Sequence, residues 1–203
     1  MIIKMYKYLF IFLSSLFSES TVTDTFVIKY EQLPNHYLKD LDNNKRNIYD
    51  FLNDGPAAIS FWFLACEPCK KEMVYLDEYN QKYAKYGFKV VSINTDNSRT
   101  FNRVKPFVNS KKYSFTVLSD PKSLFFRKTG GQICPYLILV DDTGNIINKH
   151  IGYNPGDEIK LEGEIVNMLI NQIKLDTTLV DSSIIRIINN KILEKENLIE
   201  NKE

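Results

Sequence analysis

The chain has few histidines, an odd and small number of cysteines, and almost no net charge. With 26 basic and 25 acidic residues, its net charge of +1 gives no support for nucleic-acid binding. With three cysteines, a disulfide between any two of them leaves the third unpaired. Because 44% of its 203 residues are apolar and 25% are charged, the composition is that of an ordinary soluble protein. The length suits one domain with a substantial core and extensions.

The N-terminal apolar run is shorter than the roughly 18 residues that a membrane-spanning helix needs. A basic start is followed by the apolar-dominated residues 8–17, and Ser18 and Ser20 are small residues compatible with cleavage before Thr21. This pattern predicts that residues 1–20 are a signal peptide or an N-terminal anchor. We therefore expect an exported, for example periplasmic, protein. A buried N-terminal strand or helix is the less favoured alternative.

Residues 21–174 are expected to form one α/β domain, and residues 175–203 a polar tail with at most one short helix. Turn residues 42–44 predict a hairpin ahead of the core. Hydrophobic periodicity then predicts strands at 57–63, 88–94 and 114–120, helices at 66–86, 98–111 and 121–130, a hairpin over 135–153 and a closing helix at 155–173. This alternation predicts a central mixed sheet with helices on both faces.

The segment FWFLACEPCKKEM places Cys66 and Cys69 where an apolar strand passes into a helix. At the helix start, free backbone N–H groups and the positive helix end favour a Cys66 thiolate. Cys69, one turn later, is close enough to resolve a mixed disulfide formed at Cys66. Zinc is disfavoured, because only one further cysteine, His36 and His150 remain as ligands. A purely structural disulfide is a weaker alternative, since so small a loop constrains little unfolded chain.

The dithiol segment resembles the active site of thioredoxin-fold proteins, especially the exported TlpA/ResA-like thiol–disulfide oxidoreductases of the redoxin branch. Residues 130–146 (GGQICPYLILVDDTGNI) are similar to that fold's cis-proline strand and hairpin, and residues 152–165 to its last loop and helix. The resemblance covers residues 24–174. It implies a thioredoxin-like fold with an N-terminal β-hairpin and an inserted βα unit. It also implies that Pro135 is a cis-proline beside the dithiol, where an extended substrate can pair with the strand.

The proton acceptor departs from the thioredoxin pattern. Thioredoxins keep a buried Asp on the strand before the dithiol, and alignment places Ser60 there, which cannot accept the proton. Glu72, three residues after Cys69 on the same helical face, resembles the acidic residue of ResA-like members. We predict that Glu72 takes the proton as Cys69 becomes nucleophilic. The alternative is a solvated glutamate in the surface run at 70–72.

Five residues around the two motifs are predicted to contribute to substrate binding. Cys134 precedes the cis-proline and is an inert buried thiol, a tuner of substrate binding, or a third redox or metal-binding sulfur. Trp62 is expected to pack near the site. Glu67 puts negative charge between the thiols and should oppose thiolate formation, although Pro68 and the helix dipole act too. Pro135 completes the set.

The resemblance implies an exported protein-disulfide reductase without cofactor or metal. Its substrate would be a protein disulfide, with apocytochrome c among the candidates, and a membrane electron donor of the CcdA/DsbD kind would recharge it. We expect a monomer. One alternative is a Cu(I)-handling chaperone that uses Cys66, Cys69 and Cys134. The other is a thiol peroxidase, which is disfavoured because no Pro-x-x-x-Thr/Ser-x-x-Cys pattern leads to Cys66.

Overall fold

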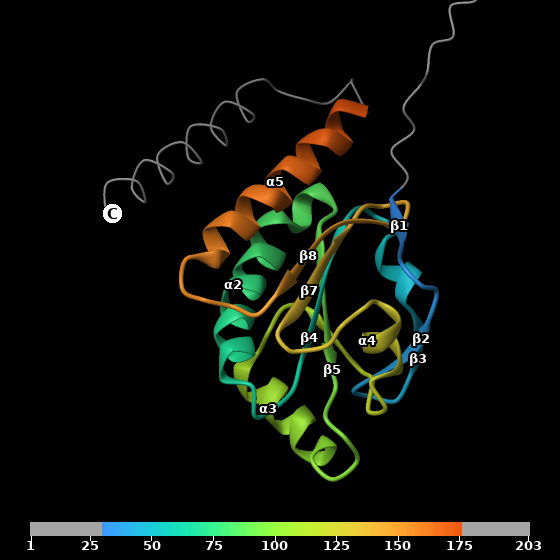
Figure 1. Cartoon of the computed structure of the whole chain (residues 1–203), viewed down its shortest axis with the longest axis vertical. Coiled ribbons are helices and arrows are strands. Elements are labelled where there is room, and N and C mark those ends of the chain that lie inside the picture. The colour runs from blue at the N-terminus through green and yellow to red at the C-terminus, as the bar shows by residue number, and fades with distance from the viewer. Residues whose placement is uncertain (1–29, 176–203) are drawn as a thin grey trace, which may run out of the picture.

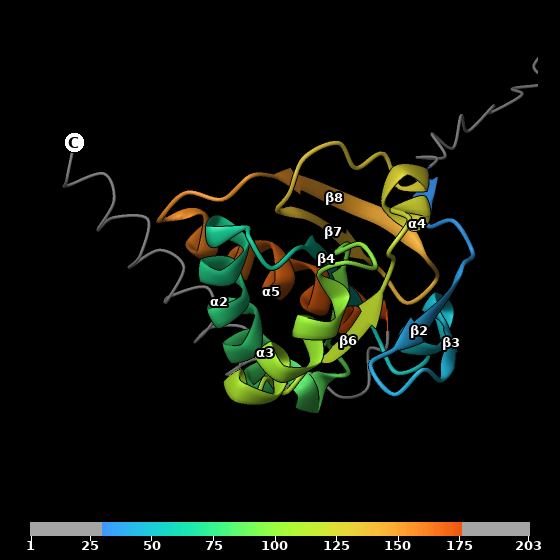
Figure 2. The same ribbon diagram turned by 90° about the horizontal axis from the view of Figure 1, so that it is seen from below.

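A computed structural model describes residues 30–175 of the chain. Within this range an eight-stranded mixed sheet runs in the order β1-β8-β7-β4-β5-β6-β2-β3 and carries helices on both faces (Figures 1 and 2). The predicted α/β class and the alternation of strands and helices are confirmed. The predicted signal peptide or anchor at 1–20, and all but the first residue of the predicted tail at 175–203, lie outside the described residues.

The elements have the following bounds. The strands are β1 Glu31–Gln32, β2 Tyr37–Asp40, β3 Lys45–Asn47, β4 Ala57–Trp62, β5 Lys89–Asn94, β6 Thr116–Ser119, β7 Tyr136–Val140 and β8 Asn145–Ile151. The α-helices are α2 Glu67–Tyr83, α3 Val104–Lys111, α4 Leu124–Lys128 and α5 Asp157–Leu175. Short 3-10 turns are η1 Ile48–Phe51, η2 Ala84–Tyr86 and η3 Phe101–Arg103.

Strand β4 lies at the centre of the sheet and is buried along its whole length. It pairs in parallel with β5 and antiparallel with β7, so neither edge is free. Its sequence AAISFW is almost continuously apolar, as expected for a strand that is covered on both faces. The strand that leads into the dithiol is therefore rigidly held.

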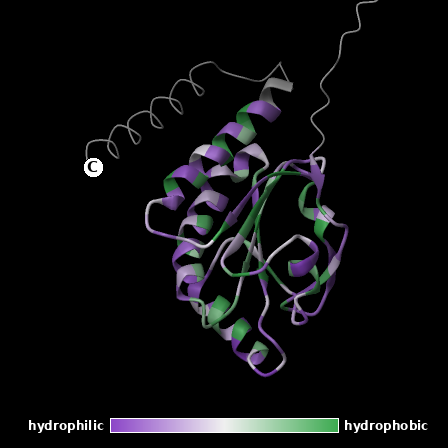
Figure 3. Ribbon diagram, in the orientation of Figure 1, coloured by the Kyte–Doolittle hydropathy of each residue, from purple (hydrophilic) through white to green (hydrophobic). Residues whose placement is uncertain are grey.

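The core has two halves, one on each face of the sheet. Helices α2, α3 and α5 cover one face, where the apolar side chains of α2 meet those of β4 and α5. Helix α4 and η1 cover the other, where Leu38 of the strand β2 also contributes. Figure 3 shows hydrophobic residues concentrated along the sheet and hydrophilic residues on the outer helix faces. The first half includes Trp62, Cys66, Cys69, Met73, Leu76, Ile165 and Leu169, and the second Ile48, Ile59, Phe61, Phe125 and Ile138.

The N-terminal part contributes to both edges of the sheet. Strands β2 and β3 form the predicted hairpin, whose turn holds Asn43 at a positive φ of 70°. The Asp40 carboxylate accepts hydrogen bonds from the backbone N–H groups of Asp42 and Asn44, which closes this turn. Strand β1, in contrast, pairs with β8 at the opposite edge.

The connection from α2 to β7 contains two βα units, β5–α3 and β6–α4. This is the layout that the predicted inserted unit requires. Helix α5 then packs beside α2, where the Tyr79 hydroxyl donates to the Glu158 carbonyl oxygen at 2.9 Å and the Tyr83 hydroxyl donates to Glu162 at 2.9 Å (Figure 1). Among residues 30–175, no helix has the length and apolarity to cross a membrane.

Candidate functional site

The dithiol lies where the central strand β4 passes into helix α2. Cys66 is the N-cap of α2, with an extended backbone at φ −84° and ψ 97°, and a proline, Pro68, occupies the first turn. Proline is tolerated there because its missing N–H would have no partner inside the helix. The backbone N–H of Cys69 donates to the Cys66 sulfur at 3.2 Å. Cys66 therefore lies at the N-terminus of α2, where the helix dipole is positive.

Cys66 and Cys69 form a disulfide, with their Cα atoms 5.3 Å apart. This is the predicted pairing. Cys66 keeps 5% of its surface exposed, whereas Cys69 is completely buried. An incoming disulfide can therefore reach only Cys66, which is the asymmetry that a two-step exchange needs.

The peptide bond between Cys134 and Pro135 is cis, as expected. Strand β7 begins at the next residue, Tyr136, which pairs with Phe61 near the end of β4. The Pro135 carbonyl oxygen accepts a hydrogen bond from the Gly152 N–H at 2.8 Å. The antiparallel β4–β7 pairing brings the cis-proline loop to the end of the sheet from which the dithiol projects.

Cys134 is a free, half-buried thiol that packs against the apolar cluster containing the dithiol. Burial raises the pKa of the Cys134 thiol to about 11, a hydrogen bond with Thr95 opposes this shift, and the charge of Glu72 adds to it. The thiol is therefore protonated at neutral pH. Its three interpretations stay predictions.

Glu72 is buried, with 4% of its surface exposed. Burial raises the pKa of its carboxyl from 4.5 to about 7, an effect that the Ser60 hydrogen bond opposes and the charge of Asp157 increases. The Ser60 hydroxyl donates to Glu72 Oε2 at 3.0 Å. The alternative of a solvated surface glutamate is wrong, because Glu72 shares the inward face of α2 with Cys69. A buried acid that titrates near neutral pH can exchange protons with a thiol.

Glu67 has the opposite environment, on the outer face of α2. Its side chain is 73% exposed and forms an ion pair of 2.6 Å with Lys70. The hydrogen bond and charge of Lys70 lower the pKa of the Glu67 carboxyl. The negative charge expected to oppose thiolate formation is thus partly offset by Lys70.

Trp62 lies completely inside the molecule. Its ring packs on Phe107 of α3 with centroids 5.6 Å apart. Its Nε1 has no hydrogen-bond partner among the residues that the structure describes. With no exposed surface, Trp62 cannot contact a substrate directly in this conformation, so it supports the site by packing and does not belong with the substrate-contacting residues.

Two exposed apolar side chains that the sequence reasoning missed flank the motifs. Phe63 follows β4 and is 37% exposed, and Ile133 directly precedes Cys134 and is 61% exposed. Because β4 and β7 are antiparallel neighbours, these two loops lie at the same end of the sheet. The signal in the sequence was an apolar residue three positions before Cys66 and another directly before Cys134.

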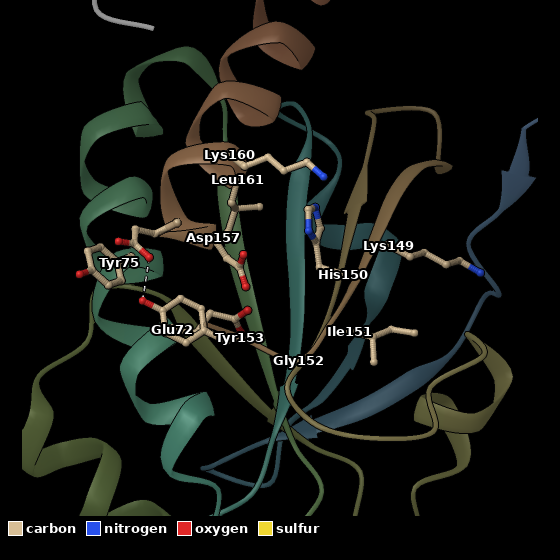
Figure 4. A pocket seen from close by; sticks show the side chains of 11 residues that line it. Glu72, Tyr75, Lys149, His150, Ile151, Gly152, Tyr153, Asp157, Lys160 and Leu161 are labelled. Atoms are coloured by element: carbon tan, nitrogen blue, oxygen red, sulfur yellow. Dashed lines mark hydrogen bonds between the residues drawn. The ribbon is translucent and has the colours of Figure 1, made fainter. Parts of the chain in front are cut away.

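A pocket of about 240 Å³ opens beside Glu72. Its side chains come from α2, the end of β8 and the start of α5 (Figure 4). His150 Nε2 lies 2.6 Å from Glu164 Oε2, and Tyr153 donates to Glu158 at 2.8 Å. No pattern in the sequence indicates this pocket, because it forms only where α2, β8 and α5 come together. Glu72 is one of the residues that line it, so the pocket reaches from the surface to this buried residue.

No group of three or more His, Cys, Asp and Glu side chains in residues 30–175 is placed to hold a metal ion. The site brings together four kinds of group. These are one reachable sulfur, one buried sulfur, a buried acid near its titration midpoint and an apolar rim.

Comparison with known proteins agrees with this geometry. Residues 28–165 match the Redoxin family. The chain is 28% identical over 130 residues to the thiol–disulfide oxidoreductase ResA of Bacillus thuringiensis, an alignment that covers 64% of this chain and 73% of that protein. A putative thiol:disulfide interchange protein DsbE from Chlorobium tepidum superposes with a TM-score of 0.64 at 27% identity, covering 70% of this chain and 97% of that one.

A more distant structure shows the fold. The thioredoxin domain of a thiol–disulfide oxidoreductase from Bacteroides vulgatus superposes with a TM-score of 0.57 at 23% identity, covering 67% of this chain and 95% of that one. The predicted thioredoxin-like architecture is therefore confirmed.

Proposed function

Because the chain belongs to the redoxin family and is a thiol–disulfide oxidoreductase, we propose that it reduces disulfides in exported proteins. One observation carries this proposal. A reachable Cys66 sulfur sits at a helix start, its partner Cys69 is completely buried, and the buried acid Glu72 follows one turn later.

In the first step, the Cys66 thiolate attacks one sulfur of the substrate disulfide. A bond forms between Cys66 and that sulfur, the substrate disulfide breaks, and its second sulfur leaves as a thiolate that takes up a proton. The N–H of Cys69 and the positive end of α2 stabilise the attacking thiolate. Pro68 holds this first turn in helical geometry.

In the second step, Cys69 attacks Cys66 and releases the other substrate sulfur. Cys69 must first lose its proton, and Glu72 on the same buried face accepts it. With a pKa near 7, the Glu72 carboxyl is ionised often enough to accept a proton at neutral pH. The products are a reduced substrate and the Cys66–Cys69 disulfide, so two electrons pass to the substrate.

The substrate segment is held in extended form against the backbone at Cys134 and Pro135. Phe63 and Ile133 give the apolar contacts on either side of the disulfide. Glu67 is exposed and directly follows Cys66 in the sequence, so we propose that its charge acts on the arriving substrate chain. Apocytochrome c is one candidate substrate of this kind.

Repeated turnover needs a reductant for the Cys66–Cys69 disulfide. In an oxidising compartment we propose a membrane electron donor of the CcdA/DsbD kind. Export would depend on residues 1–20 acting as signal peptide or anchor, with residues 21–174 as the catalytic domain and residues 175–203 as a tail. We propose that the domain acts as a monomer.

The reduction potential of the Cys66–Cys69 pair tests this proposal. It is measured on residues 21–203 equilibrated in defined thiol buffers and followed by Trp62 fluorescence. A reductase predicts a value at or below about −250 mV, and a value near the roughly −120 mV of strong oxidants would reverse the proposed direction of electron flow. A Cys134→Ser variant is the control, and it should report the same two-electron transition.

The two alternative functions make separate predictions. A Cu(I)-handling protein would take up Cu(I) stoichiometrically, and the uptake would require Cys134. A thiol peroxidase would consume peroxide at Cys66 far faster than a free thiol does. Neither alternative has a specific observation in its favour among residues 30–175.

A further inference from the structure

Two buried serines are neighbours on adjacent strands, and one of them contacts Glu72. Ser60 on β4 and Ser92 on β5 are register partners in the parallel pair, and both are completely buried. The Ser60 hydroxyl donates to Glu72 Oε2 at 3.0 Å. The Ser92 hydroxyl has no hydrogen-bond partner within residues 30–175.

The Ser60 contact joins a central strand of the sheet to the dithiol helix. Ser60 is in the middle of β4, where its backbone lies between Ser92 of β5 and Leu137 of β7. Glu72 is on α2, one turn beyond Cys69, and its long side chain has several rotatable bonds. A donor on a fixed strand therefore selects one position of the carboxyl group out of many.

The same contact acts on the charge of Glu72. A hydrogen bond is roughly twice as strong when its acceptor is ionised, so a donor that remains in place favours the carboxylate over the acid. Burial acts in the opposite direction and is the larger effect. Without a donor, a carboxyl this deeply buried would hold its proton to a higher pH.

We propose that Ser60 is a positioning residue for proton transfer at Cys69, because its hydroxyl fixes the Glu72 carboxyl and keeps it able to ionise. The inference rests on the proposed role of Glu72 as proton acceptor. It also accounts for the serine at a strand position where thioredoxins have an acid. Here the acid is on the helix, and the strand supplies its hydrogen-bond donor.

Other charged groups face Glu72 from the neighbouring elements. Asp157, at the start of α5, raises the pKa of the Glu72 carboxyl, so it opposes Ser60. The basic side chains of β8 already have partners, Lys149 with Glu31 at 2.6 Å and the His150 ring with Glu164 at 2.6 Å. The remaining titratable groups are the Cys134 thiol and the pocket side chains Tyr75, Tyr153, Glu158 and Lys160.

The test compares Ser60→Ala with Ser92→Ala in the full-length protein. Both changes remove one hydroxyl from a fully buried serine at the same level of the sheet, so they match in size and burial. The Glu72 carboxyl is titrated by carbon-13 NMR in the oxidised protein, assigned with Glu72→Gln. The Ser60→Ala variant should move its midpoint upward by about one pH unit, a tenfold change in the ionisation equilibrium, and Ser92→Ala should leave it in place.

A kinetic measurement distinguishes positioning from a purely structural role. The pH midpoint of disulfide reduction should rise in Ser60→Ala by the same amount as the NMR midpoint, and Ser60→Thr, which keeps the hydroxyl, should restore both. If the alanine variant fails to fold, Ser60→Thr is compared with Ser60→Val instead. These two side chains have nearly the same shape, and only threonine has a hydroxyl group, so the pair tests the same hydrogen bond.

Two results would overturn the inference. The first is that the pH midpoint of the Glu72 carboxyl is the same in Ser60→Ala as in the wild type, or that Ser92→Ala shifts it by the same amount as Ser60→Ala. The other is a shifted midpoint with an unshifted pH–rate profile. Failure of the proposed function is a different result, namely no reductase activity above that of Cys66→Ser, and the NMR titration is readable even then.

Discussion

Glu67 and Glu72 lie five positions apart at the start of one helix, and their environments are opposite. The Glu67 side chain is 73% exposed and is paired with Lys70, which lowers the pKa of its carboxyl. Glu72 is 4% exposed, is bound to Ser60 and has a pKa raised to about 7. At neutral pH the first is a fixed surface charge, and the second is divided between acid and carboxylate.

The difference arises from which face of α2 meets the sheet. Cys69, Glu72, Met73 and Leu76 are all buried and form the face that packs on β4. Glu67, in the first turn, points to solvent. The dithiol therefore has a solvent-side glutamate that acts only through its charge and a core-side glutamate that can exchange protons. Residue type alone does not distinguish them.

The largest expected effect is on the pH dependence of stability. Above pH 4.5 the unfolded chain releases the Glu72 proton, whereas the folded protein keeps it until about pH 7. Stability therefore falls as the pH rises through this window, by about 3 kcal/mol in total for a shift of this size. Relative to Glu72→Gln, the free energy of unfolding of the wild type should fall by this amount between acid and alkaline pH.

Urea unfolding of the two oxidised proteins over this pH range measures the effect. The control compares the wild type with Glu67→Gln, and here the pH dependence of stability has the opposite sign. A carboxyl with a lowered pKa stabilises the fold above its unfolded pKa and loses this contribution as the pH falls. Parallel stability curves for the wild type and Glu72→Gln would show that Glu72 is not held as a buried acid.

The next effect is on turnover. Glu72→Gln removes the proton acceptor for Cys69, so kcat/KM for reduction of a protein disulfide should fall by about tenfold to a hundredfold near neutral pH. Glu67→Gln removes a charge beside the same dithiol and should change kcat/KM by less than about threefold. Equal losses in the two variants would mean that negative charge at α2, and not proton transfer, is what matters.

The smallest effect is expected for Lys70→Ala. This change leaves the Glu67 charge unpaired and removes the contact of Lys70 with the Phe107 ring. An exposed ion pair is largely screened by solvent, so the rate of alkylation of reduced Cys66 should fall by less than about threefold. A tenfold loss would show that the pair acts on the Cys66 thiolate more directly than its exposure indicates.

The fold could be predicted well from the sequence because its signals are local. The apolar run at 57–62 and the helix start at Cys66 fixed the strand–helix junction, and the similarity around Pro135 identified the cis bond. The turn residues at 42–44 gave the β2–β3 hairpin. The pairing of β1 with β8 had no such signal, since it joins segments more than a hundred residues apart.

The site was only partly predictable. Helical spacing correctly put Glu72 on the face of Cys69, but its burial in a Lys-Lys-Glu run depends on how α2 packs against β4. Ser60 as its donor and Asp157 as a neighbouring charge depend on contacts across three elements. Trp62 was placed among the substrate-binding residues because it is close to the dithiol in sequence, but its side chain is completely buried.

The measurement that tests the central claim most directly is the rate at which Cys69 resolves a mixed disulfide at Cys66, as a function of pH. Reduced protein carrying Cys134→Ser is mixed with an aromatic disulfide whose thiolate is coloured, and the second release of colour reports the attack by Cys69. The account predicts a rate that rises through an inflection near pH 7 in this protein, and a rate about tenfold or more lower and without that inflection after Glu72→Gln. The same profile with and without the Glu72 carboxyl would contradict it.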